Sequence, residues 1–467
     1  MNFFKIKSIE QFRAEDDQSA KTLNRCLGPL DLILLGVGAI IGTGIFVLTG
    51  VTAATATGPA VVISFIISGV VCTFVALCYS ELSSKIGGCG SAYGYSYAVF
   101  GQGIGFLVAW MLILEYLIAT TAVSVGWSGY LINVLNNIGM PLPESLTVGY
   151  FSNPEKGIIN LPASLILLIL MGLLLVGVRQ SATLNTVLVA IKVFAVIVFI
   201  GVAMFNIQPS NWSPFIPYGW FSTTADGHTV GIIAGASLVF FAYVGFDAVS
   251  TAAEESKNPA RDVPIGIIGS LVFCTLIYIV VSGLMTGIVS YKELNVSSPA
   301  SHALTQIGFK GASALVGTAV IAGLTSVMLV LYYALTRILF ALSRDTLIPS
   351  FFSSVNSKTK TPTRIIIATG ITMSFIAGEL PFNTLVEIVN IGTLSAFIFV
   401  CLAVPVARKR YPQYISKIVI PGGLIIPILG ALSCFGLILA LPTHTISMFA
   451  LWMLVGVLVY VLYSSRQ

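Results

Sequence analysis

The sequence predicts an all-α polytopic membrane protein with 12 transmembrane helices. The chain has 467 residues, of which 56% are hydrophobic and only 9% are charged. Soluble domains carry about 25% charged residues, so this chain lacks the polar surface needed to enclose a core of its size. Its apolar residues also form blocks of about 20, the length at which a helix crosses roughly 30 Å of hydrocarbon. These observations exclude an ordinary soluble enzyme.

Twelve apolar blocks are long enough to be predicted as membrane spans. They cover residues 31–54, 59–84, 100–133, 159–178, 183–206, 231–255, 264–289, 311–343, 365–380, 383–406, 420–440 and 446–463. Residues 1–28 precede them as a tail of mixed polar and charged residues.

Lysine and arginine set the predicted orientation of these spans. With the N-terminus inside, 18 of the 23 Lys and Arg residues fall in cytoplasmic segments, and only Lys156, Lys292 and Lys310 fall outside. Basic residues collect on the cytoplasmic side, so both termini are predicted to be cytoplasmic, in a multi-pass protein of the cell (plasma or inner) membrane. The net charge of +5 then reflects topology and contact with the lipid bilayer, and we expect no nucleic-acid partner.

The sequence contains no recognisable metal-binding spacing. His228, His302 and His444 all fall in predicted external loops, and no HExxH or CxxC pattern occurs. Because metal sites in proteins need clustered ligands at such spacings, we expect neither a metal nor another cofactor.

Span 1 is interrupted by glycine near its middle. Four glycines lie within the nine residues from Gly36 to Gly44, and glycine weakens a helix. Gly38 and Gly42 also form a GxxxG pattern, so close packing of helices is an equally good interpretation of this span taken alone.

Span 6 carries a similar interruption, at Gly245 in the stretch from Phe240 to Asp247. The two interrupted spans are five apart, so they run in opposite directions. This pattern is typical of transporters built from inverted repeats, which bind substrate at the breaks. Spans 1–5 (residues 29–207) and spans 6–10 (residues 230–408) would form the 5+5 repeat, and residues 418–465 would add two C-terminal helices.

The two breaks suit the chemistry of an amino-acid zwitterion. The helix that restarts near Thr43 offers free N–H groups and a positive helix end to a carboxylate. Free carbonyls, where the first halves stop, suit an ammonium. The predicted substrate-binding residues are Ile40, Ile41, Gly42, Thr43, Gly44, Phe241, Ala242, Val244 and Asp247. Phe241 is predicted as a lid over the substrate, although a packed core position is the more common place for a phenylalanine.

Three charged residues, Glu115, Lys192 and Asp247, fall near the predicted midplane, where a charge is costly and marks a functional candidate. Burial lets a lysine lose its proton; the alternative is a permanently paired structural Lys192. Glu115 is either its ion-pair partner or a proton relay. Asp247 either stabilises the start of the second half-helix or contacts a basic substrate side chain.

Three further charged residues lie near the ends of predicted spans. Arg337 is predicted to be an interfacial anchor near the cytoplasmic end of span 8. Glu254 and Glu255 face the predicted cytoplasmic side beside Arg261, where they could form a gate-closing ion pair.

The stretch from Gly38 to Phe46, followed by Gly58 and Pro59, resembles the first helix of the amino acid–polyamine–organocation superfamily. The stretch from Phe246 to Gly266 closely resembles the cationic amino acid transporter branch. Further matches are Glu81 with residues 90–93, and residues 125–130, 190–193, 343–345 and 389–393. The resemblance implies a LeuT-like fold and amino-acid substrates.

Within that family the sequence is interpreted as a permease that imports L-amino acids, cationic and/or small neutral, by proton symport. Sodium-coupled relatives of this fold hold Na⁺ between spans 1 and 8, and the ammonium of Lys192 could occupy that place. It would then bridge carbonyls near the first break and the hydroxyls of Thr325 and Ser326. The alternatives are a sodium-coupled or uncoupled exchanger and, more remotely, a transporter-like sensor or a channel. The sequence leaves open whether a small accessory membrane subunit binds.

Overall fold

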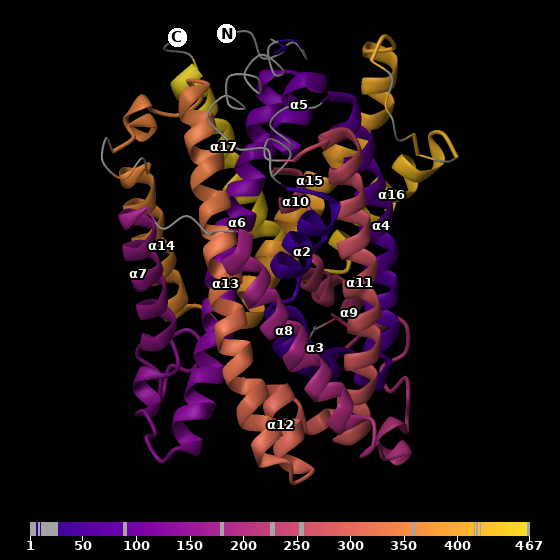
Figure 1. The fold of residues 1–467 in the computed structure, drawn as a ribbon, viewed down its shortest axis with the longest axis vertical. Coiled ribbons are helices and arrows are strands. Elements are labelled where there is room, and N and C mark those ends of the chain that lie inside the picture. The colour runs from indigo at the N-terminus through magenta and orange to yellow at the C-terminus, as the bar shows by residue number, and fades with distance from the viewer. Residues whose placement is uncertain are drawn as a thin grey trace.

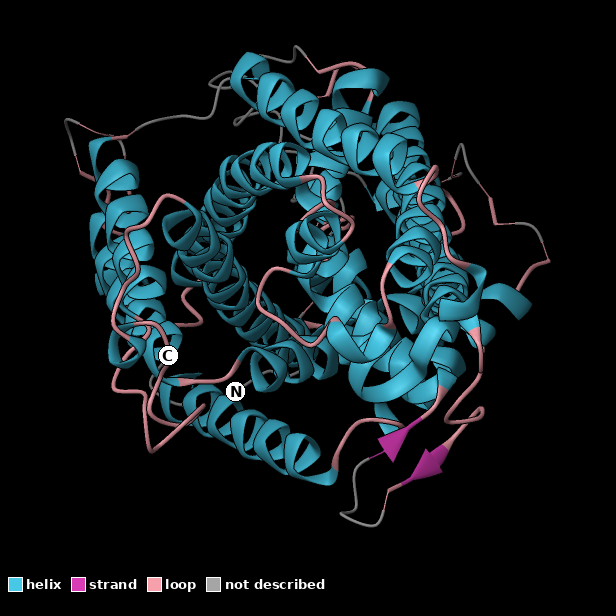
Figure 2. Cartoon of the chain, turned by 90° about the horizontal axis from the view of Figure 1, so that it is seen from below, coloured by secondary structure: helices cyan, strands magenta, loops and turns pink. Residues whose placement is uncertain are grey.

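The computed structural model describes residues 6–7, 10 and 27–464, with the exception of 87–90, 178–181, 225–228, 252–255, 357–358, 360, 415, 417–418 and 421. Most of the predicted N-terminal tail therefore lies outside the described residues. The described chain is almost entirely helical (Figure 1). Strands β1 (Ser222–Thr223) and β2 (Thr229–Val230) form one short antiparallel pair at the rim of the helices (Figure 2).

Long apolar helices make up most of the molecule. They are α4 (Val61–Ile86), α6 (Gln102–Asn137), α11 (Pro259–Ile288), α13 (Lys310–Arg344), α15 (Phe382–Arg410) and α17 (Thr443–Ser464). The other apolar helices are α7 (Leu161–Val176), α8 (Ala182–Ala203), α14 (Thr363–Glu379) and α16 (Ile425–Leu439). Among the described residues, seven helical segments are long and apolar enough to cross a membrane. This confirms a multi-pass membrane protein, while the number of 12 crossings stays a prediction.

The first of these segments, Gly44–Ile86, has 43 residues. At a rise of about 1.5 Å per residue it would reach roughly 65 Å, about twice the thickness of the hydrocarbon core. Gly58 interrupts it with a φ of +64°, which glycine adopts without strain. The turn at Gly58 therefore divides the segment into the second half of the predicted span 31–54 and the predicted span 59–84.

Two short helices were not predicted from the sequence. Helix α5 (Ala92–Phe100) and helix α12 (Pro299–Gln306) lie at opposite ends of the molecule (Figure 1). With nine and eight residues, both are far shorter than the apolar blocks by which spans are found. Gly101, with a φ of +101°, separates α5 from α6.

Buried aromatic rings hold three elements together at the centre of the fold. The rings belong to Phe65 on α4, to Tyr243 in the 3₁₀ turn at residues 240–243, and to Tyr278 on α11. Their centroids lie 5.3–6.4 Å apart. The hydroxyl of Tyr243 donates to the carbonyl of Phe65 at 2.8 Å. A buried tyrosine hydroxyl needs such a partner, so this contact fixes the position of the chain around residue 243.

Candidate functional site

The first predicted helix break is present. Helix α2 (Pro29–Ile40) ends at Ile40, and Ile41 adopts an extended conformation. The chain resumes helical geometry around Thr43 and continues as the π-helical turn η1 (Gly44–Leu48). The predicted unwinding of this span is confirmed, at residues 41–42 rather than through residue 44. The restart leaves first-turn N–H groups without intrahelical acceptors.

The second break is present as well. Helix α9 (Ile232–Val239) tightens into the 3₁₀ turn η6 (Phe240–Tyr243) and stops. Val244 is extended and Gly245 has a φ of +109°, after which helix α10 (Ala248–Thr251) begins. The predicted unwinding at residues 244–245 is confirmed.

The two breaks lie side by side. A Cβ atom added to Gly44 would lie 2.3 Å from the Cα of Ala242, and one added to Gly245 would lie 3.2 Å from the Cβ of Ala39. Only glycine lets the two backbones approach this closely.

Tyr278 joins the two breaks, a role the sequence analysis missed. Its hydroxyl lies 2.8 Å from the carbonyl oxygens of both Ile40 and Ala242. The carbonyl of Phe241 accepts from the N–H of Val244. The prediction that carbonyls at the breaks are free was thus wrong for Ile40 and Phe241, although a carbonyl retains a second lone pair.

A small cavity of about 20 Å³ lies beside the breaks. It is lined by Ala39, Ile40, Gly42, Thr43, Gly44, Ala119, Val123, Phe241, Val244, Val327 and Leu331. Six of the nine predicted substrate-binding residues are in this set. Of the others, Ala242 packs against Gly44, Ile41 is fully buried, and Asp247 bonds to Tyr116.

The sequence analysis did not single out the cavity residues on the neighbouring helices. Ala119 and Val123 come from α6, and Val327 and Leu331 from α13. They are apolar residues within long apolar helices, so no local signal distinguishes them from lipid-facing or core positions.

Thr43 is the polar side chain of the cavity. Its hydroxyl is buried and has no hydrogen-bond partner among the described residues. A Cβ added to Gly126 on α6 would lie 2.3 Å from the Cγ2 of Thr43, so glycine at 126 admits this side chain. A buried hydroxyl without a partner is costly, and a ligand in the cavity would satisfy it.

Phe241 lines the cavity and is 5% exposed. Its ring packs edge-on against Phe382, with centroids 6.4 Å apart. The position fits the predicted lid and also a packed core residue, so both interpretations stay open.

Lys192 reaches the first broken helix. Its Nζ donates to the carbonyl of Gly38 at 2.6 Å, and the side chain is 1% exposed. A Cβ added to Gly323 on α13 would lie 2.7 Å from the Cγ of Lys192, so the lysine stem packs against that glycine. The predicted contact with a carbonyl near the break is confirmed.

The predicted contact of Lys192 with hydroxyls on span 8 is wrong. The Thr325 hydroxyl donates to the carbonyl of Ile321 and accepts from Trp127. The Ser326 hydroxyl donates to the carbonyl of Gly323. Hydroxyls within a helix commonly bond to the preceding turn, and both follow that rule here.

The predicted ion pair between Glu115 and Lys192 is also wrong. Among the described residues, neither carboxylate oxygen of Glu115 has a hydrogen-bond partner, and the side chain is fully buried. No ion pair joins Lys192 to Glu115 among the described residues, and the ammonium of Lys192 donates to the carbonyl of Gly38 instead.

Asp247 lies directly before α10, as one of its two interpretations requires. One carboxylate oxygen accepts from the hydroxyl of Tyr116 at 2.7 Å, and the other has no partner among the described residues. The carboxylate is thus held by α6 rather than presented to the cavity.

The remaining charged candidates lie away from the cavity. The guanidinium of Arg337 is 4.6 Å from the centre of the Tyr333 ring, an amphipathic arrangement that suits an anchor. Glu254 and Glu255, and with them the possible pair with Arg261, lie outside the described residues.

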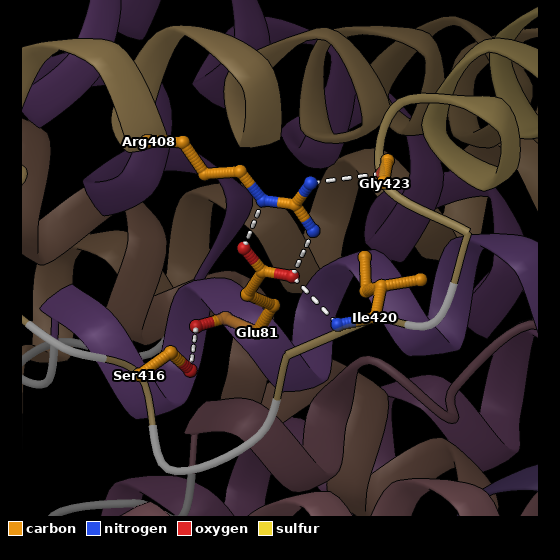
Figure 3. Close-up of polar contacts among 5 residues, drawn as sticks. All are labelled: Glu81, Arg408, Ser416, Ile420 and Gly423. Atoms are coloured by element: carbon orange, nitrogen blue, oxygen red, sulfur yellow. Dashed lines mark hydrogen bonds and ion pairs between the residues drawn. The ribbon is translucent and has the colours of Figure 1, made fainter.

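A buried polar cluster, which the sequence did not predict, joins α4 to α15 (Figure 3). The guanidinium of Arg408 donates two hydrogen bonds of 2.6 Å to the carboxylate of Glu81. The N–H of Ile420 donates to the same carboxylate at 2.9 Å. Arg408 also donates to the backbone carbonyl of Gly423. The hydroxyl of Ser416 donates to the backbone carbonyl of Glu81. The cluster fastens the segment after α15 onto α4.

Replacing Arg408 by leucine should destabilise the protein by about 3 kcal/mol, because the buried carboxylate of Glu81 loses both of its bonds from the guanidinium. Glu81 is 2% exposed, so water cannot replace the lost partner. Thermal unfolding of the purified protein in detergent measures the effect. Lys409→Leu, at the exposed neighbouring position, is the matched control; equal stability of both variants would show that the pair contributes nothing.

Comparisons with known proteins agree with this architecture. The amino acid permease family model matches residues 27–463. The chain is 42% identical to the methylthioribose transporter of Bacillus subtilis (strain 168), covering 100% of this chain and 98% of that protein. It is 44% identical to the branched-chain amino acid permease BcaP of the same organism, covering 99% and 98%. It is 35% identical to human cationic amino acid transporter 4, covering 84% and 61%. The chain therefore belongs to the amino acid permease family, and it is a membrane transporter rather than an enzyme.

Proposed function

We propose that the protein imports L-amino acids across the cell membrane by proton symport, with both termini in the cytoplasm. The observation that carries the proposal is the meeting of two broken helices beside a small cavity. Irregular backbone at membrane depth is tolerated where it lines a cavity, and transporters use it to bind substrate.

The polar groups of the cavity suit the zwitterion common to amino acids. The N–H groups at the start of η1, with the unpartnered hydroxyl of Thr43, face a negative charge favourably. The carbonyl of Ile40 keeps a lone pair for an ammonium after its bond with Tyr278. These groups favour an amino acid over a neutral sugar derivative such as the one named for the methylthioribose transporter.

The lining of the cavity favours a small or branched apolar side chain. Ala119, Val123, Val244, Val327 and Leu331 are all apolar, and no residue of the lining is charged. A basic side chain would need a carboxylate here, because an unpaired buried charge is costly. Among the relatives, this favours the substrate class named for the branched-chain permease over that of the cationic transporters.

The cavity is far too small for an amino acid, since about 20 Å³ is roughly the room a single water requires. In the described arrangement the breaks leave no room for a substrate, so the cavity must widen for binding. Substrate binding requires α6 or α13 to move away from the breaks.

Proton coupling through Lys192 is supported by the small number of groups that stabilise its ammonium. Among the described residues it has one carbonyl partner, Gly38, and no carboxylate within ion-pair distance. A buried charge with so few partners is unfavourable, which argues against a permanently paired structural lysine. Gly38 lies in the last turn of α2, so loss of the proton would weaken the charge-assisted bond that holds that half-helix. Glu115, buried and unpartnered, is the proposed relay.

Uptake into proteoliposomes tests the proposal. The panel contains L-valine, L-leucine, L-alanine, L-arginine and methylthioribose, with pH and Na⁺ gradients imposed separately. We expect accumulation of the neutral amino acids at least tenfold above L-arginine, driven by an inward proton gradient and indifferent to Na⁺. Accumulation driven by Na⁺, or strict exchange without a gradient effect, would replace proton symport; uptake of methylthioribose alone would refute the amino-acid assignment.

A further inference from the structure

A second and larger cavity, of about 150 Å³, lies between α6, α13, α14 and the 3₁₀ turn η9 (Ser350–Ser353). It is lined by Leu117, Leu339, Phe352, Ile365, Ala368, Thr369 and Thr372. We propose that this cavity binds one acyl chain of an anionic phospholipid, whose headgroup lies at Arg364.

Both hydroxyl groups of the lining already have hydrogen-bond partners. Its two hydroxyls are bonded within α14: Thr369 donates to the carbonyl of Ile365 at 2.6 Å, and Thr372 to that of Ala368 at 2.9 Å. An apolar cavity of this size stays dry and takes a guest about as large as benzene. The ligand that fits is therefore a hydrocarbon, and a segment of about six carbons fills the cavity.

The cavity borders the face of α14 that meets hydrocarbon. Ala368 and Thr372 line it and are themselves exposed. Around them on α14, Ile371 is 57% exposed and Phe375 is 72% exposed. In a multi-pass membrane protein the medium on such a face is lipid, so an acyl chain has direct access from the bilayer.

A fixed cation lies where the cavity meets the end of α14. Arg364 is exposed and directly precedes the lining residue Ile365. Its guanidinium is 4.0 Å from the centre of the Phe351 ring and donates to the Phe351 carbonyl at 3.1 Å. Phe351 is in turn adjacent to the lining residue Phe352. This places a positive charge beside the cavity, at the end of the molecule predicted to be cytoplasmic, where anionic lipids are attracted by basic residues.

The lipid cavity shares two helices with the substrate cavity. On α6, Leu117 lines the lipid cavity and Ala119 lines the substrate cavity; two residues apart, they point to nearly opposite faces of the helix. Helix α13 contributes Leu339 to one and Leu331 to the other. An acyl chain at this site would therefore resist or assist the displacement of α6 and α13 that the proposed transport requires.

Binding is tested on the purified full-length protein by native mass spectrometry, with dioleoyl phosphatidylglycerol and dioleoyl phosphatidylcholine as probes. We expect one phosphatidylglycerol to be retained about fivefold more tightly than phosphatidylcholine. Ala368→Phe should fill the cavity and abolish that retention, whereas Ile371→Phe, on the same helix outside the lining, should not. Arg364→Gln should bring the two lipids to equal retention.

Each other outcome contradicts the proposal. Equal retention in the Ala368→Phe and Ile371→Phe variants would show that lipid does not enter the cavity, and equal binding of both lipids to the unaltered protein would remove the headgroup assignment. Should Ala368→Phe fail to fold, Thr372→Phe, at an exposed lining position, takes its place under the same criteria. The binding measurement does not depend on the transported substrate, so the proposed function and this site can fail separately.

Discussion

Replacing Lys192 by methionine should abolish accumulation of substrate driven by a pH gradient. Methionine keeps the approximate length of the side chain, so packing against Gly323 survives, but it can neither carry a proton nor donate to Gly38. We expect at least a tenfold loss of gradient-driven uptake in proteoliposomes, with substrate binding retained within a few-fold.

Two comparisons make this result decisive. Lys310→Met removes an exposed lysine at the start of α13 and should leave uptake unchanged, which excludes a general effect of lost charge. If the Lys192→Met variant still concentrates substrate in response to an inward proton gradient, Lys192 is structural and the proton is carried elsewhere, with Glu115 the next residue to test.

Substituting Gly44 should have the second large effect. Any Cβ at this position would lie 2.3 Å from the Cα of Ala242, and backbone on both sides cannot yield as a flexible side chain would. Gly44→Leu should therefore separate the breaks and eliminate transport. Thr43→Val removes only one hydroxyl, and a hydrogen bond of about 1 kcal/mol corresponds to roughly a fivefold loss of substrate affinity.

Uptake rates and substrate-induced thermal stabilisation measure both variants. Gly436→Leu is the matched control, because a Cβ at 436 on α16 has no neighbour within 4 Å, and it should behave like the unaltered protein. Equal and negligible effects of the Thr43 and Gly44 substitutions on affinity would place the substrate site elsewhere.

The helix breaks could be predicted because their causes are local. The glycines from 36 to 44 and at 245 weaken helical geometry regardless of the tertiary contacts around them. The two interrupted spans are five apart, an odd number, which predicted that they run in opposite directions. The turn at Gly58 lies at the boundary between the predicted spans 31–54 and 59–84. In each case the signal and the structure it produces lie within a few residues.

Contacts between helices were predicted less well. Depth in the membrane can be counted along a span, and it placed Glu115 and Lys192 at similar levels, but it does not determine which neighbour each side chain faces. Lys192 donates to the carbonyl of Gly38, and no ion pair joins it to Glu115 among the described residues. Tyr278 and the Arg408–Glu81 pair were missed because their partners are distant in sequence. The apolar lining residues on α6, α13 and α14 were missed because nothing in the sequence distinguishes them from other apolar positions.

The hydroxyl of Tyr278 has one hydrogen but stands 2.8 Å from two acceptors. At any instant only one of the carbonyls of Ile40 and Ala242 receives it, and the other is short of a donor. The junction between the two half-sites therefore has one donor for two acceptors. A protonated primary amine, with three hydrogens to give, would end that shortage, so its arrival would be registered by both broken helices at once.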